Sequence, residues 1–438
     1  MTNPASATPF SPGKQRKVAL AACFGTFLEW YDFLTFASLA TIFGELFFPS
    51  DDPTAALLKS LATFGVGMVV RPIGAALFGS LGDRHGRRMV FISTIGLMGA
   101  ATFGVGLLPV YADVGFVAPL LLVSLRLLQG LAMGGEIGGA IVYLTEHAPV
   151  ARRGVSTSVL QLMGPLGVMA STFQIVLLQR WLSVEEFHQW GWRVPFILSA
   201  LLLAISLKSR IALHESPVFL SLGERKQIAK TPLRDCLSDP LTRKRMALLF
   251  FCISSGGSLL FFSSQVYAPV FLKTVVNMES SQAGELTLLA TLALFPLTIF
   301  AGWLSDRIGR RPVLLNGLLL GAGGVMPVYA GLLDFGGNPL AVVAMLLVLV
   351  AAVALITGPQ TATLAELFPA RTRYSAVGLP HNLAAGWIGG MSPFMVTWIA
   401  SKAGNPLAGL LYPALLLMLA FAVGWRYLPE TRGTSLDD

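Results

Sequence analysis

The chain has 438 residues, of which 54% are hydrophobic and 12% are charged, and its mean hydropathy is +0.69. Soluble proteins carry about a quarter charged residues, so the composition excludes an ordinary soluble protein and indicates a polytopic membrane protein. The net charge of +8 does not indicate nucleic-acid binding, because the Lys and Arg residues are spread along the chain. Three cysteines without metal-ligand spacing predict no disulfide framework, and the polar N-terminus predicts no removable signal peptide.

Twelve apolar segments follow one another along the chain, each long enough to cross a bilayer as a helix of about 20 residues. Six precede a hydrophilic stretch, at about 18–48, 55–81, 89–111, 116–144, 155–181 and 190–207. Six follow it, at about 246–272, 283–304, 312–333, 339–365, 374–400 and 405–427. We therefore predict an all-α polytopic membrane protein with twelve transmembrane helices.

Short motifs recur in both halves of the chain. The sequence GSLGDRHGRR at 79–88 is repeated as GWLSDRIGRR at 302–311, and two loops later Glu146 and Arg153 match Glu366 and Arg373. Such a repeat predicts two six-helix pseudo-repeats, the parallel-repeat plan of certain secondary transporters. The predicted divisions are an N-terminal tail 1–17, a first half 18–207, a linker 208–245, a second half 246–427 and a C-terminal tail 428–438.

Positive charge marks one side of this predicted bundle. Lys and Arg residues concentrate in the N-terminal tail, in the linker and in the loops that share their side. Cytoplasmic loops carry the excess of Lys and Arg in membrane proteins. We therefore expect both termini to be cytoplasmic.

The repeated Gly-x-x-x-Asp-Arg-x-Gly-Arg-Arg loop resembles the signature of the major facilitator superfamily. Further stretches resemble its metabolite:proton symporter family: EWYDF at 29–33, RPIG at 71–74, RLLQG at 126–130, GGE at 134–136 and WGWRVPF at 190–196. The resemblance implies the major facilitator fold, a bacterial inner (cytoplasmic) membrane location, a monomer, and a proton as coupling ion with no cofactor. Carriers of citrate, tricarballylate, 2-oxoglutarate, shikimate, and proline or betaine belong to that family.

Two acids interrupt the first apolar helix. Glu29 and Asp32 are three residues apart and therefore share one helix face. Because burying a charge at the bilayer centre costs about 2.5 to 3.5 kcal/mol of free energy, we expect these acids to have a functional role. We predict Asp32 as the first candidate for the proton-coupling residue, Glu29 as the second and Glu136 as the third. The alternatives are a structural pair of Glu29 with Arg71, and a helix-packing role for the glycine-rich surroundings of Glu136.

Arg126, Gln129 and Glu136 form one stripe along the fourth helix. Arg126 suits bidentate carboxylate binding, and we predict it as the substrate anchor, with Gln129 beside it. Its alternative is a structural ion pair with Asp32, Glu29 or Glu136. Both interpretations hold together if substrate carboxylate replaces the acid at Arg126 and leaves that acid free to take a proton.

Polar residues on other apolar helices are predicted to complete the binding site, although each also fits an interhelical hydrogen bond. They are Arg71, Gln265, Tyr267, Gln360, His381 and Asn382. The repeated loops predict a gating latch, with topology setting as the alternative. The latch residues are Asp83, Arg84, Arg87, Asp306, Arg307 and Arg310.

These features together predict a proton-coupled symporter that imports an organic acid by alternating access, a di- or tricarboxylate such as citrate or 2-oxoglutarate. The alternative substrate is a zwitterionic osmolyte such as proline or betaine, because three acids against two arginines leave no surplus positive charge for a trianion. A substrate sensor without transport, a drug exporter and a membrane enzyme are further alternatives. The expected partners are the small molecule, the proton and the lipid bilayer; we predict no nucleic acid, no metal site and no catalytic residue.

Overall fold

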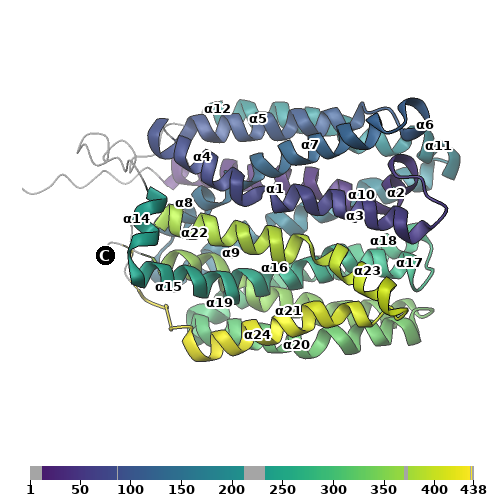
Figure 1. The fold of residues 1–438 in the computed structure, drawn as a ribbon. Coiled ribbons are helices and arrows are strands. Elements are labelled where there is room, and N and C mark those ends of the chain that lie inside the picture. The colour runs from purple at the N-terminus through teal and green to yellow at the C-terminus, as the bar shows by residue number, and fades with distance from the viewer. Residues whose placement is uncertain (1–11, 86, 212–231, 369–372, 435, 437–438) are drawn as a thin grey trace, which may run out of the picture.

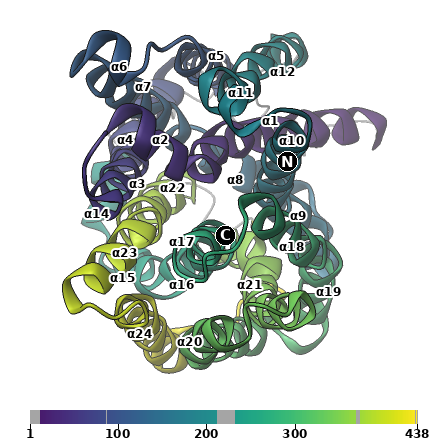
Figure 2. The same cartoon turned by 90° about the vertical axis from the view of Figure 1, so that its right-hand side faces the viewer.

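The computed structural model describes residues 12–85, 87–211, 232–368, 373–434 and 436. Long helices run nearly parallel in two groups, with the first half of the chain above the second in Figure 1. We call the end that carries α14 and the C-terminus the linker end, and the end that carries α6 and α11 the far end. Figure 2 looks onto the far end, where the two halves lie side by side.

The first half contains the six predicted segments, most of them broken into consecutive helices. Their bounds are α1 (Pro12–Ser38), α2 (Ala40–Phe47), α3 (Pro53–Val69), α4 (Arg71–His85), α5 (Arg87–Gly106), α6 (Tyr111–Val114), α7 (Val117–Gly134), α8 (Ile137–His147), η1 (Val150–Arg152), α9 (Arg153–Gln161), α10 (Met163–Trp181), α11 (Val184–Gln189), η2 (Gly191–Arg193) and α12 (Val194–Ile211).

The second half follows the same plan and adds three π-helical segments, η3, η4 and η5. Its bounds are α14 (Pro232–Ser238), α15 (Pro240–Leu248), η3 (Leu249–Ser254), α16 (Ser255–Phe261), η4 (Phe262–Tyr267), α17 (Ala268–Thr274), α18 (Ser280–Leu292), α19 (Leu294–Ile308), α20 (Arg310–Phe335), α21 (Pro339–Glu366), α22 (Arg373–Leu383), η5 (Ala384–Gly390), α23 (Ser392–Ala403), η6 (Ala408–Leu410) and α24 (Leu411–Tyr427).

Each of the twelve predicted segments coincides with one helix or one run of helices. Within the described residues, 10 runs are long and apolar enough to cross a membrane, and Ile92–Gly106 is a shorter apolar helix. The all-α membrane prediction is therefore confirmed. Helix α15 begins at Pro240, before the predicted apolar segment 246–272, because Asp239 caps it by accepting a hydrogen bond from the Thr242 backbone N–H at 2.9 Å.

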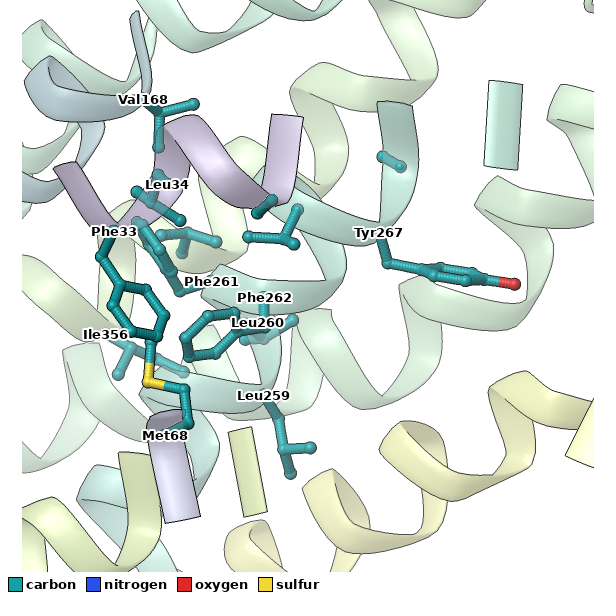
Figure 3. Packing of buried hydrophobic residues seen from close by; sticks show 14 of the residues in the cluster. Phe33, Leu34, Met68, Val168, Leu259, Leu260, Phe261, Phe262, Tyr267 and Ile356 are labelled. Atoms are coloured by element: carbon teal, nitrogen blue, oxygen red, sulfur yellow. The ribbon is translucent and has the colours of Figure 1, made fainter. Parts of the chain in front are cut away.

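Apolar side chains from both halves meet in the middle of the molecule. Figure 3 shows Phe33 of α1 and Met68 of α3 packed near Phe262 and Ile356 of the second half. Glycines let the helices of the first half approach closely, since a side chain at Gly130 would collide with the Gly67 carbonyl. This packing brings α3 against α7, the helix that carries the buried Arg126.

Candidate functional site

A cavity of about 60 Å³ lies between the two halves. A water molecule needs about 10 to 15 Å³ of cavity volume, so the cavity has room for a few waters, and a larger ligand requires the halves to separate. The first half contributes Thr26, Trp30, Ile137, Ile141, Leu160, Gln161, Gly164 and Pro165. The second half contributes Gly257, Ser258, Phe261, Phe262, Val353, Thr357, Gln360, His381 and Ala385.

The cavity lining is aromatic and neutral. The Trp30 ring lies 5.2 Å from the Phe261 ring and 6.5 Å from the Phe262 ring, measured between centroids. Hydroxyl, amide and imidazole groups supply the polar part of the lining, and among the described residues no Asp, Glu, Lys or Arg side chain belongs to it. Of the predicted binding residues, Gln360 and His381 therefore line the cavity.

Arg71 joins the halves behind this cavity. Its Nε donates to Asn382 Oδ1 at 3.1 Å, and Asn382 Nδ2 donates to the Gly134 carbonyl at 3.3 Å. Glu29 lies close enough to Arg71 for their charges to interact, as the structural alternative for Glu29 expects. Arg71 and Asn382 thus link α4 to α22 instead of lining the cavity.

A helix break next to Arg71 adds a second link between the halves, from α3 to η5. Pro72 has no N–H, and Ile73 N bonds the Val70 carbonyl at 3.0 Å, so the Val69 carbonyl loses its helical partner. The indole N–H of Trp387 donates to that carbonyl at 2.9 Å. The α3–α4 break is therefore part of the contact between the halves.

Arg126 is fully buried among aromatic rings. Its guanidinium carbon lies 4.0 Å from the Phe33 ring centroid and 4.3 Å from that of Phe36, and its Nη1 donates to Gln129 Oε1 at 2.7 Å. Within the described part of the chain, no carboxylate lies within 4.0 Å of Arg126, and Arg126 does not line the cavity. The direct ion pair considered for Arg126 is absent from this arrangement.

Thr102 lies between Gln129 and Asp32. Its hydroxyl donates to the Met98 carbonyl at 3.0 Å. Gln129 Nε2 donates to Thr102 Oγ1 at 2.6 Å, and the Asp32 carboxylate lies beside the same hydroxyl. Thr102 is 1% exposed. A lone threonine in an apolar helix gives no sequence signal, so only the tertiary packing identifies this residue.

Three other predicted residues lie away from the cavity. Glu136 is buried at the junction of α7 and α8, where a side chain at the adjacent Gly134 would collide with the Arg71 carbonyl. Gln265 Oε1 accepts from Thr291 Oγ1 at 2.8 Å. The Tyr267 ring points away from the central packing group in Figure 3, and its centroid lies 5.7 Å from that of the Tyr329 ring, with the two ring planes tilted by 40°.

At the linker end, Asp306 closes the gap between the halves. Its Oδ1 accepts from Gly154 N and its Oδ2 from Val155 N, both at 2.9 Å, at the start of α9. Arg310 Nη1 donates to Asp306 Oδ1 at 2.6 Å. Because the free N–H groups of a helix start favour an anion, this contact fits the predicted latch.

Glu366 organises a second linker-end contact. It is 5% exposed and accepts from Arg153 Nη1 at 3.1 Å, from Arg310 Nε at 3.3 Å and from Thr431 Oγ1 at 2.8 Å. The Thr434 carbonyl also accepts from Arg153, at 3.1 Å. The C-terminal segment is thereby bound to both halves.

The remaining predicted latch residues contribute less to the described network. The Arg307 guanidinium lies 4.3 Å from the Trp303 ring centroid. The side chains of three lie outside the described residues: Asp83, Arg84 and Arg87. Glu366 and Arg153 were omitted from the predicted latch, although their place in the internal repeat was a signal.

Comparison with known proteins assigns the family. The profile of the sugar (and other) transporter family matches residues 18–250 and 236–438. The chain belongs to this transporter family. It is 36% identical over 430 residues to the inner membrane metabolite transport protein YhjE of Escherichia coli, covering 96% of each chain. It is 30% identical to the proline/betaine transporter of Salmonella typhimurium, covering 95% of this chain and 83% of that one.

Solved structures confirm the fold of this transporter. The proton:xylose symporter XylE bound to 6-bromo-6-deoxy-D-glucose superposes with a TM-score of 0.77 at 20% identity, covering 98% of each chain. A partially occluded inward-open structure of XylE from E. coli gives 0.75 at 21% identity, covering 97% of this chain and 100% of that one. The predicted twelve-helix major facilitator fold is confirmed, and the protein is a multi-pass membrane transporter, not an enzyme.

Contacts hold the halves of the transporter together on both sides of the cavity. Asp306 and Glu366 do so at the linker end, and the Arg180–Glu285 ion pair joins α10 to α18 at the far end. Separation of the halves at the linker end therefore requires the Asp306 and Glu366 contacts to break.

Proposed function

We propose that the protein is a proton-coupled importer of small zwitterions, such as proline or a betaine, that works by alternating access. The observation that carries this proposal is the absence of a charged side chain from the cavity lining in the described residues. A charged group buried without a partner is costly. A solute with no net charge therefore fits this lining better than the di- or tricarboxylate predicted from the sequence.

The two ends of a zwitterion match two parts of the lining. Trp30, Phe261 and Phe262 offer ring faces, which attract ammonium groups through the ring quadrupole. Gln360 and His381 offer hydrogen-bonding groups for a carboxylate. The relatives named proline/betaine transporters support the same substrate class.

Proton coupling is assigned to Asp32. Glu29 already has Arg71 as a charge partner, whereas Asp32 has no ion pair among the described residues, and Thr102 and Gln129 lie between it and Arg126. An acid without a fixed cation beside it changes its protonation more readily. We therefore place the transported proton on Asp32. Arg126, which lies beyond Gln129 and Thr102, then stabilises the ionised form of Asp32.

Two observations support a bacterial inner-membrane location with a cytoplasmic linker end. A relative is named an inner membrane protein, and the Lys and Arg distribution favours a cytoplasmic linker end. We propose a bacterial inner-membrane location with both termini in the cytoplasm, and a monomer as the working unit.

Uptake into proteoliposomes tests the substrate class. With the lumen alkaline, labelled glycine betaine or proline should accumulate, whereas labelled citrate and 2-oxoglutarate should not. Asp32→Asn should lose accumulation driven by the pH gradient while keeping counterflow of the same solute. Accumulation of citrate in place of glycine betaine would overturn the zwitterion assignment, and equal loss of both activities in Asp32→Asn would overturn the coupling assignment.

A further inference from the structure

A second cavity, of about 30 Å³, lies between the halves toward the far end. It is bordered by α1 and α2 and by α10, α17 and α18. Lys273 is its one charged lining residue among the described residues. Neutral polar groups complete the polar part of its lining: Ser38, Thr41, Thr172, Gln179 and Ser280.

Lys273 has no acidic partner in the described part of the chain. No described carboxylate lies within 4.0 Å of its ammonium group. Two acids at the same end have other partners: Glu285 pairs with Arg180, and Glu45 lies 3.2 Å from His188. The Lys273 side chain is partly exposed, so its charge is available to a ligand.

Along α1, the second cavity lies between the far end and the central cavity. Thr41 lines both this cavity and a hollow of about 510 Å³ at the far end. Ala37 of the same lining lies on α1 about 10 Å from Trp30, since seven residues of helix rise about 10 Å. A solute that moves along α1 from the far-end hollow toward the central cavity passes Lys273.

We propose that Lys273 and its neutral neighbours form an entry site for the carboxylate group of the substrate. The proposal rests on the proposed zwitterion transport for the identity of the solute. The central cavity offers a carboxylate only neutral donors, whereas a lysine ammonium offers three donors and a full charge. A cation at a cleft also raises the local concentration of anionic groups. Lys273 thus captures the carboxylate before the halves rearrange around the solute.

Chemical labelling tests the site without relying on transport. The purified full-length protein is acetylated at its amines by N-hydroxysuccinimidyl acetate, and acetylation of each lysine is followed by mass spectrometry. Sodium acetate and glycine betaine should slow acetylation of Lys273, whereas acetamide and sodium chloride at matched concentration should not. Lys402, exposed at the end of α23, should react equally in all four solutions. Equal labelling of Lys273 with acetate and with acetamide would overturn the entry site.

Transport kinetics test its role. Lys273→Gln should raise KM for glycine betaine about tenfold, the loss expected for one charged hydrogen bond, and should leave kcat nearly unchanged. Lys273→Arg should restore a low KM, and Lys402→Gln should match the unaltered protein. A fall in kcat at constant KM would assign Lys273 to gate movement and overturn the proposal. If the unaltered protein does not transport glycine betaine, the proposed function is wrong. The labelling experiment with acetate still shows whether Lys273 binds a carboxylate.

Discussion

Asp306→Asn is expected to open the linker end of the transporter. The Asp306 carboxylate uses both oxygens across the gap between the halves, one for Gly154 N and one for Val155 N, each at 2.9 Å. An asparagine amide keeps one acceptor oxygen and turns the other position into a donor that faces a backbone N–H. The substitution also removes the charge that pairs with Arg310 at 2.6 Å.

The size of the effect follows from these bonds. A hydrogen bond to a charged group contributes about 1.5 to 3 kcal/mol. Losing one of the two, and weakening the other by neutralisation, should cost the closed linker end about 2 to 3 kcal/mol, which shifts the equilibrium about 30- to 150-fold toward opening. Glu366 remains in place, so opening should be partial.

Pulsed electron paramagnetic resonance measures this shift. Spin labels at Ala151→Cys, on η1, and at Ile308→Cys, at the end of α19, lie on exposed positions of the two halves. The three native cysteines are buried. Asp306→Asn should increase the long-distance population, whereas Asp334→Asn, an exposed acid on α20, should not. Unchanged distances in a folded Asp306→Asn protein would refute the latch.

Three further substitutions test other parts of the structure. Thr102→Val removes the hydroxyl that accepts from Gln129 at 2.6 Å and should shift the pH profile of uptake. The control is Thr145→Val, because the buried Thr145 hydroxyl donates to the Ile141 carbonyl of its own helix, at 2.7 Å. This control should leave the pH profile unchanged. Gly134→Ala brings a methyl group onto the Arg71 carbonyl and should lower the melting temperature by several degrees, about 1 to 3 kcal/mol, whereas Gly323→Ala enters open space and should not. Asp239 is outside the membrane, and its bonds from Thr242 lower its pKa; its stabilising effect is therefore full above the unfolded-state pKa and lost as pH falls through the folded value. On acidification, the melting temperature of Asp239→Asn should fall less than that of the unaltered protein. An equal fall in both proteins would show that the Asp239 cap does not contribute to stability.

The helices could be predicted from the sequence because each apolar run is long, and the buried charges because they interrupt those runs. Gln360 and His381 are predicted to belong to the binding site because they are polar residues on apolar helices, and both line the cavity. The sequence predicts Gln129 beside Arg126, but the aromatic neighbours of Arg126 could not be predicted in this way. Phe33, Phe36 and Gln129 surround it from two helices, and their meeting depends on the close packing around Gly67 and Gly130.

The C-terminal contacts were also beyond local sequence patterns. Thr431 and Thr434 follow the last helix in a polar tail, and nothing in their spacing indicates Glu366 or Arg153 as partners. Side-chain contacts between distant segments depend on how whole helices pack. Sequence therefore predicted the latch loops but not the tail bound to them.

The sign of the transport current tests the central claim most directly. A zwitterion that moves with a proton carries one positive charge inward, whereas a dicarboxylate that moves with one proton carries a negative charge. On proteoliposomes adsorbed to a solid-supported membrane, a glycine betaine jump should give an inward positive current that is lost in Asp32→Asn, and citrate should give none. A current with citrate and none with glycine betaine would contradict proton-coupled zwitterion import.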